Sequence, residues 1–250
     1  MKSKQGMFAI ILVVLLLTVT NVLAITTSVS LEELKSILSY SEKLYYPVSQ
    51  FVFGKTGQYL NSMIAEQNID QYDAFGPFSA SFSFLSTINN GWKKYQQTSD
   101  ASNALIQYLH YYESVINAFA LGGSQSIKKI CFFYLNNLSV FLYSLGQYDY
   151  YVDLNKFLLA NLKSLGNEDL DIFEVKSYIY INRAVIKLFE EDYIAATHYF
   201  YLAHLVNSRQ KEDILTLNNV KDKTLREKYS ETKYFTILKV LLETPSVINK

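Results

Sequence analysis

Hydrophobic side chains recur every three or four residues through most of this chain. One unbroken series consists of Ile127, Ile130, Tyr134, Leu138, Phe141 and Leu145, and a second of Tyr151, Leu154, Leu158, Leu162 and Leu165. This spacing keeps one face of an α-helix apolar, whereas the alternating β-branched runs that would indicate strands are weak here. The pattern predicts an all-α chain of amphipathic helices.

Polar and glycine-containing breaks divide the helical pattern into segments. Ser99-Asp100, Gly122-Gly123, Gly146 and Gly166 each follow an apolar series and predict helix ends. No proline occurs in residues 78–244, so the strongest helix breaker is missing there and these softer breaks decide where the helices end.

A helix start is marked near the N-terminus. Ser30 and Glu33 have the spacing of a capping box, in which each side chain bonds a backbone N–H of the first turn. They predict a helix from Leu31 to about Tyr45, because Pro47 disfavours a helical conformation in the residue before it. The stretch from there to Pro77 is irregular.

These features divide the chain into four expected regions. Residues 1–24 form a leader, residues 25–77 an N-terminal helical cap region, residues 78–208 a series of helical hairpins and residues 209–250 a C-terminal capping region. The last region begins with mixed charges, typical of a solvated surface, and continues into one amphipathic helix that would cover the final hairpin.

A repeat appears within the hairpin region. Asn137-Leu138-Ser139, followed by Gly146-Gln147-Tyr148, recurs 45 residues later as Asn182-Arg183-Ala184, followed by Glu191-Asp192-Tyr193. A fainter copy begins at Asn89-Asn90-Gly91-Trp92. Each copy predicts a long helix, a short turn and a second helix, and a regular period indicates a stacked repeat architecture.

The stretch from Tyr180 to Ser208 resembles a tetratricopeptide repeat. The family places small and aromatic residues at fixed positions of its hairpin, which are matched here by Ala184, Tyr193, Ala196, Phe200 and Ala203. Arg183 and Lys187 depart from the family pattern, and the 45-residue period exceeds the family's period of about 34 residues. The resemblance implies a degenerate, tetratricopeptide-like α-solenoid, a right-handed stack of antiparallel hairpins with about eight to nine helices.

The resemblance also implies a binding face. Stacks of this family bind an extended peptide or a partner helix on the concave face, which the first helix of each unit lines. Asn137, Asn182, Arg183 and Lys187 occupy first helices and are the expected partner-binding residues. The alternative for each of them is an ordinary solvated helix residue.

The N-terminal region has the pattern of a secretory signal peptide. Lys2 and Lys4 precede eleven consecutive apolar residues at 7–17, and small residues lead up to Ala24, where a signal peptidase would cut. Cleavage after Ala24 is expected, and the mature chain would then be secreted or lie in the secretory-pathway lumen or the periplasm.

An uncleaved membrane anchor is the alternative for the same region. Residues 5–31 carry no charge and are long enough to span a bilayer. The lysines at positions 2 and 4 would hold the start of the chain in the cytoplasm, so the rest would still lie on the extracytoplasmic side. The chain would then touch the membrane only through this segment.

Composition excludes several functional classes. Lysine plus arginine equals aspartate plus glutamate at 23 each, and no basic stripe stands out, so a nucleic-acid partner is not expected. Cys131 is the only cysteine, which excludes an intrachain disulfide and favours a buried thiol.

No catalytic, cofactor or metal site is expected. His110, His198 and His204 lack the spacing of a metal site, and no nucleophile-elbow, phosphate-loop or dinucleotide motif occurs. The sequence therefore predicts a non-enzymatic interaction or scaffold module that binds a protein or peptide. A membrane-anchored accessory subunit of a larger membrane complex is the alternative.

Overall fold

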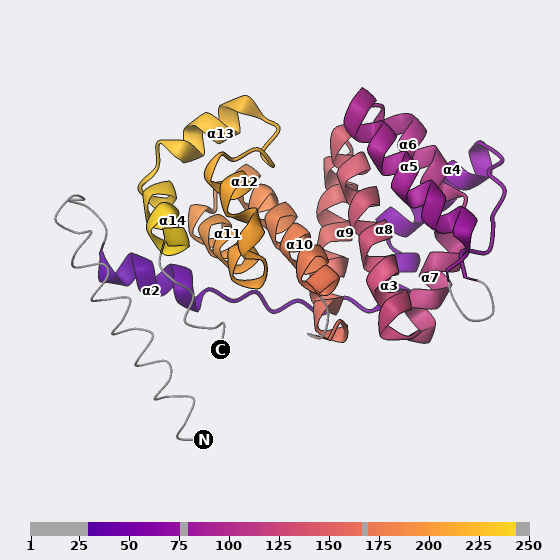
Figure 1. Ribbon diagram of the computed structural model, residues 1–250, viewed down its shortest axis with the longest axis horizontal. Coiled ribbons are helices and arrows are strands. Elements are labelled where there is room, and N and C mark those ends of the chain that lie inside the picture. Colours follow the sequence, from indigo (N-terminus) through magenta and orange to yellow (C-terminus); the bar gives the residue numbers. More distant parts are fainter. Residues whose placement is uncertain (1–29, 76–79, 167–169, 244–250) are drawn as a thin grey trace, which may run out of the picture. The chain divides into compact units, whose positions relative to one another are not determined.

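A computed structural model describes residues 30–75, 80–166 and 170–243 (Figure 1). The expected leader, residues 1–24, lies outside these ranges. The described residues form thirteen α-helices, two short 3-10 helices and no strand, so the all-α prediction is confirmed. The α-helices are α2 (Leu31–Ser39), α3 (Val48–Val52), α4 (Lys55–Glu66), α5 (Phe82–Thr98), α6 (Ala101–Leu109), α7 (Tyr112–Leu121), α8 (Gln125–Ser144), α9 (Tyr148–Asn161), α10 (Leu170–Phe189), α11 (Tyr193–Val206), α12 (Lys211–Leu215), α13 (Lys223–Ser230) and α14 (Lys233–Glu243).

The expected count of eight to nine helices is too low. One helix was expected to run from residue 101 to Leu121, but the chain turns at His110 and Tyr111 and separates α6 from α7. Short helices such as α3 and α12 add to the number, because a five-residue helix is too short to show hydrophobic periodicity. The helix after Ser30 ends at Ser39, earlier than expected.

The chain forms two compact units. One unit is the continuous segment Lys43–Ile179, and the other combines the described residues up to Glu42 with those from Tyr180 onward. The division falls inside α10. The regions expected from the sequence, with divisions after residues 24, 77 and 208, stay predictions.

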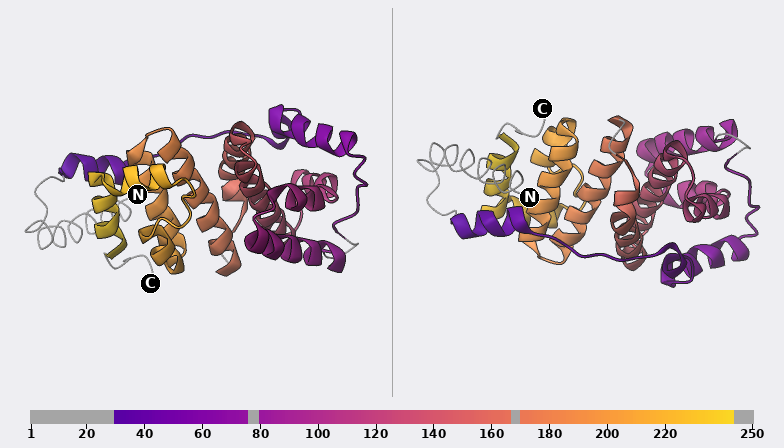
Figure 2. Two further views of the ribbon diagram at one scale, coloured as in Figure 1. Left: turned by 90° about the horizontal axis from the view of Figure 1, so that it is seen from above. Right: turned by 90° about the horizontal axis from the view of Figure 1, so that it is seen from below.

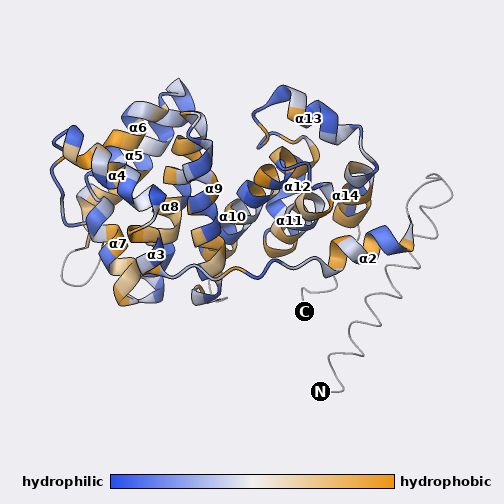
Figure 3. Cartoon of the chain, turned by 180° about the vertical axis from the view of Figure 1, so that it is seen from behind, coloured by the Kyte–Doolittle hydropathy of each residue, from blue (hydrophilic) through white to orange (hydrophobic). Residues whose placement is uncertain are grey.

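In the continuous unit, α8 is the central helix. It packs against α6, α7 and α9 (Figure 2). Hydrophobic positions, orange in Figure 3, and hydrophilic positions, blue, share the same helices, as amphipathic packing requires. The Tyr108 hydroxyl, fully buried, donates to the Ile88 carbonyl at 2.7 Å and accepts from Asn137 Nδ2 at 3.0 Å. Three helices are thus joined through one side chain, which satisfies buried polar atoms inside an apolar core.

The same core contains a close contact between two helices at Gly91. A Cβ on Gly91 would lie 3.0 Å from the Tyr108 ring, so the bare backbone of α5 lets α6 approach. Cys131 is fully buried, as expected, and burial raises the pKa of its thiol to about 12. The thiol therefore stays protonated and unreactive at neutral pH.

The second unit is organised around α11, which packs against α2 and α14. Leu34 and Ile37 of α2 form a buried cluster with Ile237 and Leu241 of α14. The predicted capping box is confirmed, since Ser30 Oγ accepts from the Glu33 N–H at 3.2 Å and Glu33 Oε2 accepts from the Ser30 N–H at 3.1 Å. Helix α2 is thus capped by its own first residues and packed against α14, which lies near the other end of the chain.

The 45-residue repeat is confirmed by the helix bounds. Helices α8 and α10 have 20 residues each, α9 and α11 have 14 each, and all four boundaries differ by the same 45 positions. The type of helical repeat stays a prediction.

A common turn joins the two helices of each hairpin, including α5 and α6. One residue has a positive φ, which is 56° at Ser99, 73° at Gly146 and 58° at Glu191. The N-cap residue follows with φ between −84° and −80° in all three turns. The left-handed residue reverses the chain within two positions, so each second helix starts beside the end of the first.

Gly146→Ala tests how much the left-handed turn residue contributes. No atom lies within 4 Å of the added Cβ, so the backbone conformation alone should decide the effect. We expect the free energy of unfolding in urea to fall by about 1 kcal/mol, the usual cost of a non-glycine residue at positive φ.

The matched variant is Glu191→Gly at the equivalent turn, where the same argument predicts a gain of stability. Glu191 also forms an exposed ion pair with Lys228 at 2.7 Å, which contributes little. Equal stability changes of the same sign in the two variants would contradict the shared conformation.

Candidate functional site

Two of the four expected partner-binding residues lie around one carboxylate. Arg183 on α10 forms a two-pronged ion pair with Glu42, with Nε donating to Oε2 at 2.9 Å and Nη2 bonded to Oε1. Lys187 Nζ, one turn further, lies 3.7 Å from the same Oε1 and donates to Glu190 at 2.7 Å. The Tyr199 hydroxyl of α11 donates to Glu42 Oε2 at 2.8 Å. We call Glu42, Arg183, Lys187, Glu190 and Tyr199 the Glu42 cluster.

The two cations of the cluster are buried although they are charged, while Glu42 is half-buried and Glu190 is exposed. Arg183 is only 1% exposed and Lys187 is 8% exposed. A planar guanidinium matches a carboxylate with two parallel hydrogen bonds, which is the arrangement that best offsets the cost of burying both charges. Glu42 belongs to the extended segment after α2, so the pair fixes that segment to α10.

The electrostatics of the cluster follow from this packing. Burial would raise the pKa of Glu42, but hydrogen bonds from Arg183 and Tyr199 and the charges of Arg183 and Lys187 outweigh it, so the pKa lies below its ordinary value. Burial and the hydrogen bond to Glu42 both raise the pKa of Tyr199. Glu42 is ionised and Tyr199 neutral at physiological pH.

One atom of the cluster remains unsatisfied. Arg183 Nη1 is buried and has no hydrogen-bond partner in the described residues. Two of the three guanidinium nitrogens therefore account for the bonds to Glu42. The remaining one adds to the cost of burial, so the pair stabilises the fold less than its short distances suggest.

The structure places the other two expected residues apart from this cluster. Asn137 is 9% exposed and bonds Tyr108 within the continuous unit, while Asn182 on α10 is half-buried. Partner contact by these four residues stays a prediction. Three of them, Asn137, Arg183 and Lys187, already bond side chains of this chain.

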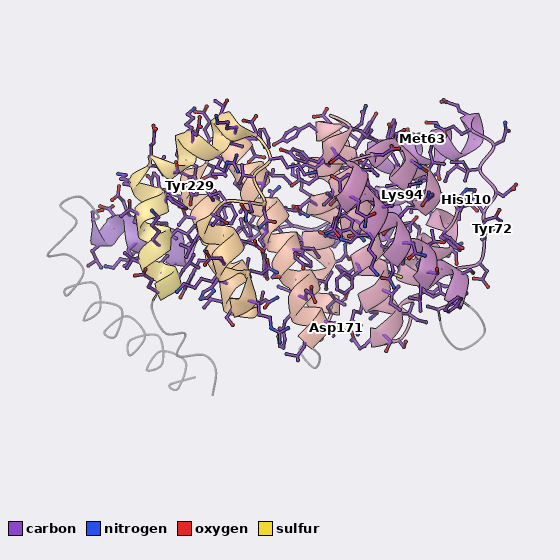
Figure 4. All side chains as sticks on the ribbon, turned by 45° about the horizontal axis from the view of Figure 1, so that its top comes forward. Met63, Tyr72, Lys94, His110, Asp171 and Tyr229 are labelled. Atoms are coloured by element: carbon purple, nitrogen blue, oxygen red, sulfur yellow. The ribbon has the colours of Figure 1, made fainter. Side chains whose placement is uncertain are left out.

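The continuous unit also has a surface pocket of about 260 Å³. We call it the Tyr72 pocket, and it is lined by Tyr72, Ser86, Thr87, Asn90, Gln107, His110 and Tyr111. It lies where the loop before residue 76 meets α5 and the turn between α6 and α7. Tyr72 and His110 lie side by side at the edge of this unit (Figure 4).

The loop that supplies Tyr72 is tied to the α6–α7 turn by main-chain and side-chain bonds. The Tyr72 N–H donates to the His110 carbonyl at 2.7 Å, and Gln71 Nε2 donates to the Leu109 carbonyl at 2.8 Å. The His110 ring bonds the Asp70 carbonyl through Nδ1 at 2.9 Å. Because a carbonyl only accepts, Nδ1 carries the hydrogen and Nε2 is the acceptor nitrogen of the neutral ring.

Sequence reasoning assigned no role to the pocket residues or to Glu42. The pocket combines a loop with two helices, and Glu42 is separated from Arg183 by 141 positions. One signal was present: Asn90 in the fainter repeat copy is equivalent to Asn137 and Asn182. Of these three asparagines, Asn90 is the one that lines the pocket.

No group of three or more His, Cys, Asp or Glu side chains in the described part of the chain is arranged to hold a metal ion. No helix in residues 30–75, 80–166 and 170–243 combines the length and apolar character needed to cross a membrane.

Comparisons of this chain with protein-family models, with curated proteins and with solved structures gave no significant match in any of the three.

Glu42→Gln tests the cluster. The variant keeps the shape of the side chain but leaves Arg183 buried without a counter-charge, so we expect the free energy of unfolding at neutral pH to fall by about 3 kcal/mol. Since the folded pKa of Glu42 is lowered, the wild type's advantage should hold above the ordinary value of 4.5 and disappear as the pH falls below it. Urea unfolding at a series of pH values measures both effects.

The control is Glu227→Gln, which removes an exposed pair with Lys223 at 3.6 Å on α13. Its effect should stay below about 0.5 kcal/mol and show little dependence on pH. If the two variants behaved alike, the Glu42 cluster would be no more than a surface ion pair.

Proposed function

We propose that this chain is a non-enzymatic interaction or scaffold module built from tetratricopeptide-like helical hairpins. The observation that carries the proposal is the structural repeat, in which paired helices of 20 and 14 residues recur with the same left-handed turn. Repeated hairpins create extended surfaces suited to holding another chain. The ion pairs of the Glu42 cluster are accounted for by packing within the fold.

A protein or peptide partner is the proposed ligand of this module. The first helix α8 is covered, because α6 and α7 pack against it as well as α9. Helix α5 is different: one face is buried through Phe84, Ile88 and Tyr95, and the opposite side is exposed. The exposed side of α5 is the first-helix surface most open to a partner.

The module is proposed to work on the extracytoplasmic side of a membrane. This rests on the basic start, apolar stretch and small residues at 1–24. With the leader removed, the chain would lose two lysines and no acid, which leaves 21 basic and 23 acidic residues.

Cross-linking in the native source tests the partner proposal. Lys93 and Lys94 are exposed on α5, whereas Lys223 and Lys228 are exposed on α13 and serve as an internal reference. With a lysine-reactive reagent and peptide mass spectrometry, we expect links to one partner protein to gather at the α5 pair. Links that favour α13, or none to another protein, would contradict the proposed face.

Intact mass tests the proposed location. The natively expressed protein should begin at Ile25 and dissolve without detergent, because the leader has been removed. A mass that retains residues 7–25, together with a need for detergent, would instead support the membrane-anchored accessory subunit.

A further inference from the structure

The Tyr72 pocket has an unusual chemical composition for its size. It combines two tyrosines and a histidine with two amides and two hydroxyl groups, and none of its seven lining residues is Lys, Arg, Asp or Glu. An anionic or cationic ligand would lose hydration here without gaining a counter-charge. The lining therefore favours an uncharged ligand with many hydrogen-bonding groups.

One wall of the pocket is a fixed aromatic ring. Tyr72 stacks on His110 with ring centroids 5.2 Å apart and planes 7° from parallel, and it is 49% exposed. Tyr111 contacts its edge at 5.9 Å. Because His110 holds one face, the ring presents its other side as a rigid apolar surface that loses little entropy on binding.

The opposite wall provides polar atoms at defined orientations. Asn90 Nδ2 donates to Ser86 Oγ at 3.0 Å, which fixes the amide and presents its oxygen as an acceptor. Gln107 Nε2 donates to Asn103 at 3.0 Å in the same manner. With the Ser86 hydroxyl as a donor beside these two acceptors, the wall matches groups that both donate and accept, as hydroxyls do.

The pocket volume limits the ligand. About 260 Å³ lies just below the roughly 300 Å³ at which pockets for drug-sized molecules begin. A single six-membered sugar ring has the required size, an apolar face of C–H groups for the tyrosine and a rim of hydroxyls for the amides.

We propose that the Tyr72 pocket binds one uncharged sugar residue, either free or at the end of a glycan. Tyr72 stacks on the C–H face of the sugar, and Asn90 and Gln107 accept hydrogen bonds from neighbouring hydroxyls. This inference goes beyond the proposed protein-binding function and does not depend on it.

Titration of the purified full-length mature chain tests the proposal. The probes are the methyl glycosides of glucose, galactose, mannose and N-acetylglucosamine, followed by ligand-observed NMR or calorimetry. At least one should bind saturably at millimolar concentration. Trisaccharides that end in the same residue distinguish the source: tighter binding than the methyl glycoside indicates a glycan end, and equal or weaker binding indicates the free sugar.

Matched variants connect the binding to the pocket. Asn90→Ala should weaken it about tenfold, the effect of one lost hydrogen bond, while Asn89→Ala, at the neighbouring exposed position that does not line the pocket, should not. Tyr72→Ala should abolish binding, Tyr72→Phe should retain most of it, and Tyr45→Ala, at an 87% exposed tyrosine of the same unit, should leave it unchanged.

Several results would overturn the proposal. They are the absence of saturable binding by all four glycosides, equal losses in the Asn89 and Asn90 variants, or preferential binding of an acetylated tetrapeptide with the same variant pattern. If Tyr72→Ala fails to fold by circular dichroism, the Asn90 and Tyr72→Phe variants still decide the matter. Failure here would leave the cross-linking pattern at α5 unaffected, so the two proposals can fail separately.

Discussion

The two-residue turn with one left-handed residue is the constraint on which the hairpins depend. Without a disulfide, this chain must hold its helices by packing, and the short turn lets the second helix of each hairpin start directly beside the first. Gly146 meets the backbone requirement without cost, while Ser99 and Glu191 meet it with strain. The next residue then caps the new helix, most clearly at Asp192, whose side chain accepts from the Ala195 N–H at 3.1 Å. One turn geometry thus joins the two helices of each hairpin.

Much of the fold could be predicted because its signals are local. Short stretches of sequence specify the structure at their own positions. Examples are the capping box at Ser30, the break at Ser99-Asp100 and the turn motifs that recur every 45 residues. The break at His110 was missed for a physical reason. No glycine or proline marks it, and it is held instead by distant bonds from Asp70 and Tyr72 to residue 110.

The candidate sites were harder to predict than the helices. Arg183 and Lys187 depart from the family pattern and lie on a first helix, so a partner outside the chain was expected to contact them. The structure supplies an internal explanation, since Glu42 neutralises them from a segment with no sequence signal of its own. A polar residue on an apolar helix therefore indicates a counter-charge, but sequence alone does not say which chain provides it. In the same way, the Tyr72 pocket depends on a loop whose position only tertiary contacts determine.

The Glu42 cluster has a consequence for the order in which the molecule can form. Its carboxylate leaves the ribosome early, whereas Arg183, Tyr199 and α14 follow after the whole of the continuous unit has been made. The Glu42 charge and the apolar face of α2 therefore remain uncovered until the last part of the chain has been synthesised. The segment Lys43–Ile179 has no such delay, because it forms a compact unit from one continuous stretch of chain. Domains generally fold as they are synthesised, so the middle of this chain is complete before its beginning is.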